Sequence, residues 1–276
     1  MKIEVRGVNK FFGNKQALKD VNLALQKGEI FGFVGANGAG KTTLMRIIMG
    51  VLLPDSGEVL IDDRPATQND RRQIGYMPSE RGLYAKMKVF EQLVFFAEIR
   101  GLSNPAAKKQ ASEWIERLNI MEYADKNLET LSTGNQQRVQ LAVALIAKPK
   151  ALILDEPFSG LDPLAVQTMS DVIREQAAAG LPVLFSSHQL DLVDQISNQV
   201  AVISHGQIVA TGSPEQLRKT AHAPATIKIP TPLSHIFGDL IAKDEAKNDQ
   251  NQSKDQAKSA ENPKNHTKTA GKAQNV

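Results

Sequence analysis

One stretch decides the fold: Gly35-Ala36-Asn37-Gly38-Ala39-Gly40-Lys41-Thr42, which matches the pattern G-x-x-x-x-G-K-[ST]. It follows an apolar run at 29–35 that predicts a strand, and it precedes a helical pattern at 42–49. Glycines leave backbone N–H groups free to surround phosphate oxygens, and a helix start adds partial positive charge. We therefore predict a phosphate-binding loop in which Lys41 reaches the β- and γ-phosphates and Thr42 ligates Mg²⁺. The alternative is an ordinary glycine-rich turn.

A second motif lies at 151–156, where the apolar run Ala-Leu-Ile-Leu ends in Asp155 and Glu156. In a phosphate-loop protein such a strand is expected to hold Mg²⁺ through its first carboxylate, here Asp155. Glu156 is then placed to polarise a water for attack on the γ-phosphorus. Many strands end in acidic residues, so this motif gains its meaning from the loop upstream.

Composition narrows the class of protein. The 276 residues predict one to two domains, and 41% hydrophobic with 23% charged residues is near the average of soluble globular proteins. No cysteine is present, which excludes disulfides, cysteine-bound zinc and thiol catalysis. The net charge of +3 supplies little positive potential for binding nucleic acid, so we expect no nucleic-acid partner. Apolar runs such as 141–147 are far shorter than the about 20 residues of a membrane helix, and the start of the chain lacks a signal-peptide pattern.

Strand and helix patterns alternate along most of the chain, which predicts an α/β fold with a mostly parallel central sheet. Runs at 2–6 and 17–25 predict β-structure before the loop, and helices at 91–100 and 106–118 form a helical insertion. A hairpin is expected to turn at His205-Gly206. We expect a nucleotide-binding domain over 1–220 with a helical subdomain at about 85–145, a short extension at 221–242, and a disordered polar tail at 243–276.

A third motif, Leu131-Ser132-Thr133-Gly134-Asn135-Gln136-Gln137, precedes a helical pattern at 136–147. Read alone, Ser132 is a helix N-cap and Gly134 is a loop residue. Together with the two motifs above, it makes residues 2 to 218 resemble the ATP-binding subunits of ABC transporters. The resemblance implies the P-loop NTPase fold of ABC ATPases, with an N-terminal antiparallel β subdomain. It also implies that Ser132 and Gly134 contact the ATP held by a second subunit.

The same resemblance assigns further site residues. Phe12 matches the aromatic that stacks on adenine, with a core or hairpin aromatic as the alternative. His188 matches the histidine that contacts the γ-phosphate, with a polar strand end as the alternative. Residues 159–162 match the loop that couples the two sites of a dimer. Catalysis is thus expected from Glu156, His188 and Lys41, and ATP binding from Phe12, Gly35, Ala36, Asn37, Gly38, Ala39, Gly40, Lys41, Thr42 and Thr43.

One departure from the family pattern follows Gly75-Tyr76-Met77-Pro78, where the usual glutamine is replaced by Ser79. We hypothesise slower or differently coupled hydrolysis, with Glu80 or water as the substitute for the glutamine. The charge of Glu80 would add repulsion unless Mg²⁺ or Arg81 offset it. The stretch 79–84 also resembles ATPases of two-component exporters similar to the NatA sodium-extrusion group.

The predicted function is an ATP-hydrolysing subunit that powers transport, with export favoured, through a separate integral membrane permease. It would act as a homodimer, or as a heterodimer with a second ATPase subunit, in the cytoplasm at the inner face of the cell membrane. One of the apolar residues Phe90, Leu93, Val94 and Phe96 is expected to face the permease, with packing of all four in the core as the alternative. The alternatives are a nucleotide-gated interaction module with weak turnover and a soluble ABC ATPase that does not transport.

Overall fold

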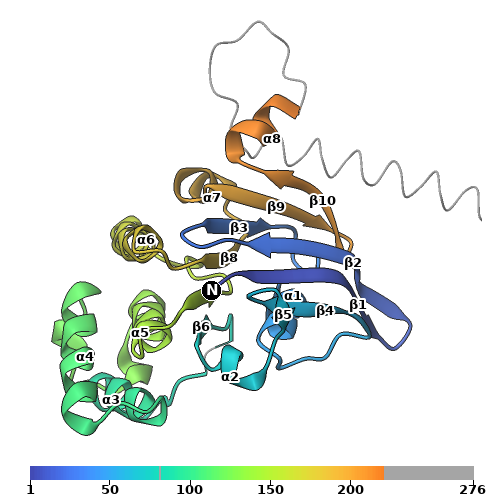
Figure 1. The fold of residues 1–276 in the computed structure, drawn as a ribbon. Helices are drawn as coiled ribbons and strands as arrows, with labels where there is room; N and C mark the ends of the chain where they lie inside the picture. The colour runs from blue at the N-terminus through green and yellow to red at the C-terminus, as the bar shows by residue number, and fades with distance from the viewer. Residues whose placement is uncertain (81, 221–276) are drawn as a thin grey trace, which may run out of the picture.

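A computed structural model describes residues 1–80 and 82–220 (Figure 1). A four-stranded antiparallel sheet has the order β2-β1-β4-β5, formed by β1 (Ile3–Phe12), β2 (Lys15–Leu25), β4 (Ser56–Ile61) and β5 (Arg64–Pro65). A six-stranded sheet has the order β10-β9-β3-β8-β7-β6, formed by β3 (Ile30–Val34), β6 (Ile74–Met77), β7 (Ala151–Leu154), β8 (Val183–Ser187), β9 (Gln199–Ser204) and β10 (Gln207–Gly212). Only β10 in this second sheet is antiparallel to its neighbour. The predicted α/β fold with a mostly parallel central sheet is confirmed.

Both faces of the central sheet are buried, which explains its continuous apolar strands. In β7, Ala151 and Ile153 pack into the core shared with the antiparallel sheet and α1 (Lys41–Ile48). Leu152 and Leu154 point to the opposite face and pack against the helices there. β7 therefore contributes side chains to both cores, which fixes the position of Asp155 directly after its last residue.

The helical insertion lies between β6 and β7, at the lower left of Figure 1. It holds α3 (Val89–Ile99), α4 (Asn104–Arg117), the 3₁₀ turns η1 (Met121–Tyr123) and η2 (Leu128–Thr130), and α5 (Thr133–Leu145). The chain then continues with α6 (Pro163–Ala178), α7 (Leu190–Ile196) and α8 (Pro214–Thr220). The extension at 221–242 and the tail at 243–276 lie outside the described residues.

Helix α5 begins three residues before the predicted start, because Ser132 caps it. The Ser132 hydroxyl accepts the Asn135 N–H at 3.3 Å, so the helix can begin directly after it. Gly134 therefore lies inside the first turn of the helix, and its reading as a loop residue is wrong.

The predicted hairpin turn is present. His205 and Gly206 have φ of 45° and 79°, the left-handed pair that a tight hairpin between β9 and β10 requires.

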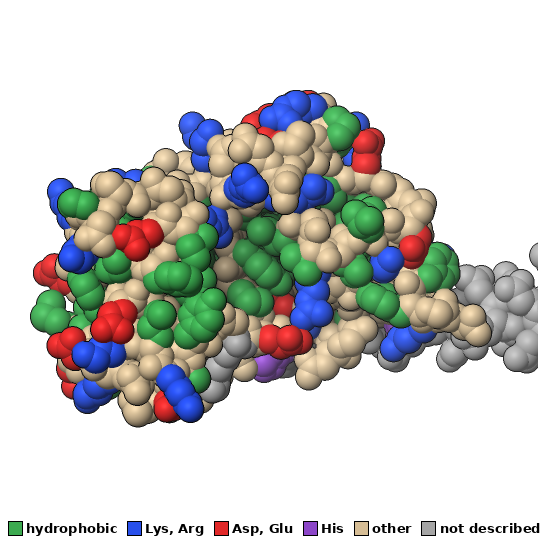
Figure 2. All heavy atoms as spheres, turned by 90° about the horizontal axis from the view of Figure 1, so that it is seen from below, with side chains coloured by type: hydrophobic (Ala, Val, Ile, Leu, Met, Phe, Trp, Pro, Cys, Tyr) green, Lys and Arg blue, Asp and Glu red, His purple; other side chains and the backbone are tan. Residues whose placement is uncertain are grey.

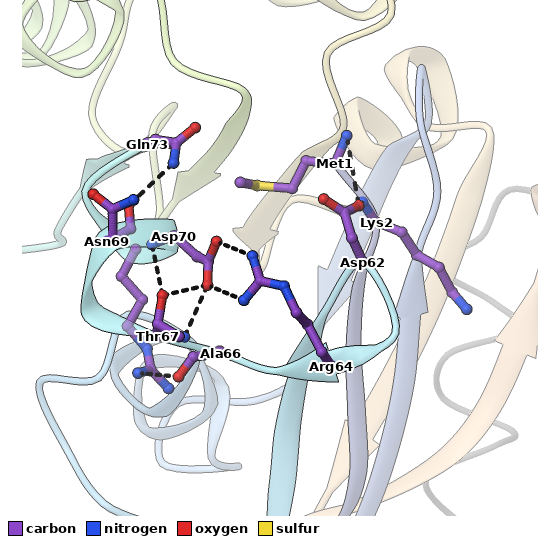
Figure 3. A network of polar contacts seen from close by, with 10 residues as sticks. Met1, Lys2, Asp62, Arg64, Ala66, Thr67, Asn69, Asp70 and Gln73 are labelled. Atoms are coloured by element: carbon purple, nitrogen blue, oxygen red, sulfur yellow. Dashed lines mark hydrogen bonds and ion pairs between the residues drawn. The ribbon is translucent and has the colours of Figure 1, made fainter.

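The short helix α2 (Gln68–Arg71), which the sequence patterns did not indicate, is held by a polar network (Figure 3). There Thr67 and Asp70 form a capping box, and Arg64 of β5 donates two hydrogen bonds to the Asp70 carboxylate at 2.7 and 2.8 Å. Those bonds hold the pKa of Asp70 well below its usual range.

Candidate nucleotide-binding site

The glycine-rich loop at 35–40 joins β3 to α1 at the carboxyl edge of the central sheet. Gly38 and Gly40 have φ of 80° and 115°, a backbone that residues with a Cβ rarely adopt. A Cβ on Gly35 would lie 2.5 Å from the Ile203 carbonyl oxygen, so this glycine is needed for close packing. The loop leads into α1 at Lys41, so its N–H groups and the helix start face the same space.

A cavity of about 400 Å³ opens over this loop. The predicted residues that line it are Phe12, Ala36, Asn37, Gly38, Gly40, Lys41, Thr42, Thr43 and Glu156, and they are joined by Lys15, Ala17 and Ser79. Gly35 and Ala39 do not line the cavity and support the loop from behind. Asp155, His188, Ser132 and Gly134 are also absent from its lining.

Lys41 is buried, with 6% of its surface exposed, and its ammonium group lies inside the loop. Nζ donates to the Gly35 carbonyl oxygen at 2.6 Å and to that of Ala36 at 3.3 Å. It also forms an ion pair with Glu156 Oε1 at 3.5 Å. A fixed cation therefore stands at the floor of the cavity, where an anionic ligand would replace these neutral oxygens.

Asp155 follows β7 and is buried directly behind Thr42. The Thr42 hydroxyl donates to Asp155 Oδ2 at 2.7 Å, and the Ser186 hydroxyl of β8 donates to Oδ1 at 2.6 Å. Burial, and to a smaller degree the charge of Asp155, raises the pKa of Tyr76 on neighbouring β6. Two hard oxygen donors thus lie together at the start of α1.

Glu156 brings three polar groups together. Its φ is 52°, a left-handed backbone that is uncommon for a residue other than glycine. Its carboxylate pairs with His188 Nδ1 at 2.9 Å through Oε2, besides Lys41 through Oε1. Its backbone N–H donates to the Ser186 hydroxyl at 2.8 Å. His188 is 52% exposed, so the carboxylate lies between a buried cation and a solvent-facing imidazole.

Ser79, at the position of the unusual substitution, lines the cavity. Glu80 does not, because its carboxylate forms an ion pair with Arg46 of α1 at 2.9 Å. The Glu80 carboxylate therefore lies with Arg46 and away from the cavity, and its replacement of the glutamine, like that by water, stays a prediction. Arg46 is its partner among the described residues, and Arg81 lies outside them.

The loop at 78–80 has a second attachment that sequence reasoning missed. The buried Gln140 of α5 donates from Nε2 to the Pro78 carbonyl oxygen at 2.8 Å and to that of Glu80 at 3.4 Å. Ser186 was missed in the same way, since its only sequence signal is a serine in an apolar strand before His188. Both residues show their partners only once α5, β7 and β8 are in place.

Ser132 and Gly134 lie at the exposed start of α5, apart from the cavity. A Cβ on Gly134 would lie 3.2 Å from Leu161 Cδ2, so the start of α5 packs against the loop at 159–162. Phe12 lies at the end of β1 with 52% of its surface exposed. The reading of Phe12 as a core aromatic is therefore excluded.

Comparisons with known proteins agree on one family. The family model described as "ABC transporter" matches residues 18–159. The Bacillus subtilis protein YhaQ, an "Uncharacterized ABC transporter ATP-binding protein", is 40% identical over 77% of this chain and 72% of its own length. The Haemophilus influenzae "Lipopolysaccharide export system ATP-binding protein LptB" is 35% identical over 75% and 89%.

A solved structure entitled "Structure of ATP binding subunit of ABC transporter" superposes with a TM-score of 0.78 at 26% identity, and covers 87% of this chain and 99% of its own. No helix among residues 1–80 and 82–220 is long and apolar enough to cross a bilayer. The phosphate loop, the acidic strand end and the capped α5 start are the residues that carried the family resemblance. The chain belongs to the ABC transporter family, as an ATP-binding subunit with ATPase activity.

Proposed function

We propose that this chain hydrolyses Mg²⁺-bound ATP in the cavity over the loop at 35–42. The observation that carries the proposal is Glu156, whose carboxylate contacts both Lys41 and His188 at the cavity wall. Phosphoryl transfer depends mainly on positioning and on compensation of charge, and these groups supply both. The adenine would stack on Phe12, and the phosphates would lie over the loop N–H groups.

Mg²⁺ fits the donor set beside this loop. Thr42 Oγ1 and Asp155 Oδ2 already lie 2.7 Å apart, and both are the hard oxygen ligands that Mg²⁺ prefers. Mg²⁺ sites commonly use one or two protein oxygens together with substrate phosphates and water, so a larger cage is not needed. When bound, the ion would neutralise phosphate charge.

The chain's own residues would perform the remaining steps. Lys41 would exchange its carbonyl partners for phosphate oxygens and hold them at the cavity floor. Glu156 would accept a proton from the attacking water, and His188 would hold its carboxylate in place from the solvent side. Substrate phosphates also relieve the ion pair between Lys41 and Glu156, which frees the carboxylate to act as a base.

We further propose that two copies act together, each completing the other's site through Ser132 and Gly134. Ser132 is exposed and Gly134 is half-buried at the start of a 13-residue helix, and neither lines the cavity of its own chain. A helix start with a capping serine offers N–H donors to an anion brought by a second chain. A homodimer is the simplest assembly, and a heterodimer with a related ATPase has the same geometry.

A separate integral membrane permease is the proposed transport partner, and the chain would work at the inner face of the cell membrane. Of the four apolar candidates, Leu93 and Val94 are buried in the core, and Phe90 and Phe96 are partly buried. The exposed apolar residues beside them are Tyr84, which packs on Phe95 and Phe96, and Ile99.

A groove of about 900 Å³ continues from Ile99, with Met49, Gly50, Gln68, Arg71, Arg72, Arg100 and Gly101 in its walls. Figure 2 shows hydrophobic side chains beside a hollow, with basic side chains at its rim. A mixed apolar and basic groove suits an amphipathic segment of a partner. The similarity to LptB, an export-system protein by its name, favours export, as does the likeness of residues 79–84 to two-component exporters of the NatA type.

The Glu156→Gln variant tests this function. Without a general base we expect turnover to fall by about a hundredfold or more, while ATP still binds and a nucleotide-bound dimer accumulates. Glu58→Gln, which changes an exposed carboxylate on β4, is the matched control and should leave both quantities unchanged. If Glu156→Gln retains turnover, Glu156 is not the general base. If the chain stays monomeric with every nucleotide, the proposed dimer is wrong.

A weakly hydrolysing, nucleotide-gated interaction module is the second candidate, and Ser79 in the cavity wall is the observation that favours it. The two candidates differ in steady-state turnover of the natural chain. A turnover number that stays near zero with and without the membrane partner, while ATP still drives dimerisation, would favour the module.

A further inference from the structure

We propose that Ser186 is a positioning residue that fixes Asp155 and Glu156 with a single hydroxyl group. This proposal rests on the proposed function in one respect, namely that Asp155 holds Mg²⁺ and Glu156 acts as the base. Ser186 is completely buried in β8, and no solvent reaches its side chain. Its hydroxyl donates to Asp155 Oδ1 at 2.6 Å and accepts from the Glu156 N–H at 2.8 Å.

The sheet register explains why one residue reaches both partners. β7 and β8 are parallel neighbours, with Leu154 paired to Phe185. The next residue along each strand is therefore Asp155 on one side and Ser186 on the other. At this point β7 ends and the chain turns away, so the Glu156 N–H has no strand carbonyl to pair with. The Ser186 hydroxyl takes that place.

The bond to Glu156 matters because of its backbone. A left-handed φ of 52° costs free energy for a residue with a side chain, and it persists only where neighbours hold it. It turns the Glu156 side chain toward Lys41 and His188 instead of along the strand direction. Removing the acceptor would leave a backbone N–H unpaired and loosen this turn.

The bond to Asp155 fixes the other carboxylate. With Oδ1 held by Ser186, Oδ2 points at the Thr42 hydroxyl, which is the side where Mg²⁺ would bind. Hydrogen bonds from the surrounding protein to a ligating carboxylate typically change metal affinity by about 10- to 100-fold when removed. An alanine, valine or isoleucine at position 186 would fill the strand but could supply neither bond.

The test is Ser186→Ala, with Ser170→Ala as the matched control. Ser170 is also buried, on α6, and its hydroxyl has no hydrogen-bond partner among the described residues. The first measurement is equilibrium binding of Mn²⁺, as a probe for Mg²⁺, to the ADP-loaded full chain. The second is binding of ADP in EDTA, which reports the nucleotide pocket without a metal ion.

We expect Ser186→Ala to weaken Mn²⁺ binding about 10- to 100-fold, with ADP binding in EDTA within about twofold of the wild type. Ser170→Ala should change neither. Equal Mn²⁺ affinity in Ser186→Ala and wild type would overturn the proposal, and so would a parallel loss of ADP binding in EDTA. Neither measurement involves ATP hydrolysis. The role of Ser186 can therefore be refuted while the Glu156→Gln result supports the proposed function, and the proposed function can be refuted while the role of Ser186 is supported.

Discussion

The proposed adenine-stacking role of Phe12 gives a prediction whose size can be worked out. The Phe12 ring lies at the edge of the nucleotide cavity and is 52% exposed, so truncation creates no core cavity. Stacking of a base on an aromatic ring contributes about 1–3 kcal/mol by alanine substitution. At 1.4 kcal/mol per tenfold, Phe12→Ala should therefore weaken ATP binding by about 5- to 150-fold. The unfolding midpoint should stay close to that of the wild type.

Phe11 provides the matched control for this experiment. It is the preceding residue on the same strand, it is 45% exposed, and it does not line the cavity. ATP affinity is measured by calorimetry on the Glu156→Gln background, so that hydrolysis does not consume the ligand. Tripolyphosphate, which carries the charges without a base, should bind Phe12→Ala and wild type equally. Equal losses of ATP affinity in Phe11→Ala and Phe12→Ala, or no loss in either, would refute the stacking argument.

Two further predictions concern stability and the partner groove. Asp70→Asn removes the charge that pairs with Arg64. Because this pairing depresses the pKa of Asp70, the ionised carboxylate stabilises the fold above about pH 4. That stabilisation is lost as the pH falls toward the depressed pKa. Urea unfolding should thus show a stability gap at pH 7 that narrows below pH 4, whereas the exposed-pair variant Asp171→Asn should show almost none, and a gap independent of pH would contradict the assignment. Ile99→Asp should reduce the amount of the chain that sediments with membranes of its natural host at least about tenfold. Met121 is equally exposed at 63% but lies away from the groove, so Met121→Asp should not have this effect. Equal effects of the two substitutions would exclude the groove as the permease contact.

The parts of the fold that were predictable from sequence are those with a local cause. The loop at 35–42 needs Gly38 and Gly40 for its own backbone, where both have a positive φ. The run at 151–154 is apolar throughout because both faces of β7 are buried. The hairpin at His205-Gly206 needs two left-handed residues in succession. In each case the residues that show the requirement are consecutive, so it can be recognised from the sequence alone.

What the sequence did not reveal depends on pairs far apart in the chain. Asp155 and Ser186 are 31 residues apart, and Gln140 and Pro78 are 62 apart. Before the strands are ordered, a buried serine or glutamine has no identifiable partner. The strand β6 was also missed, since four residues with a glycine among them give little periodicity. Its place at the sheet edge comes from pairing with β7.

The segment from Ser79 to Tyr84 joins the two proposed contacts of the molecule. Ser79 lines the nucleotide cavity, whereas Tyr84 lies on the exposed apolar surface and donates its N–H to Gln92 of α3 at 2.7 Å. Gln140 holds the start of this segment, and it lies on the helix that Ser132 caps. We therefore expect a shift of α5 relative to β6 to move the cavity wall at 78–80 through the hydrogen bonds of Gln140. If two chains bind nucleotide between them as proposed, this link would be a physical route to a third protein, and it would not need a glutamine at position 79.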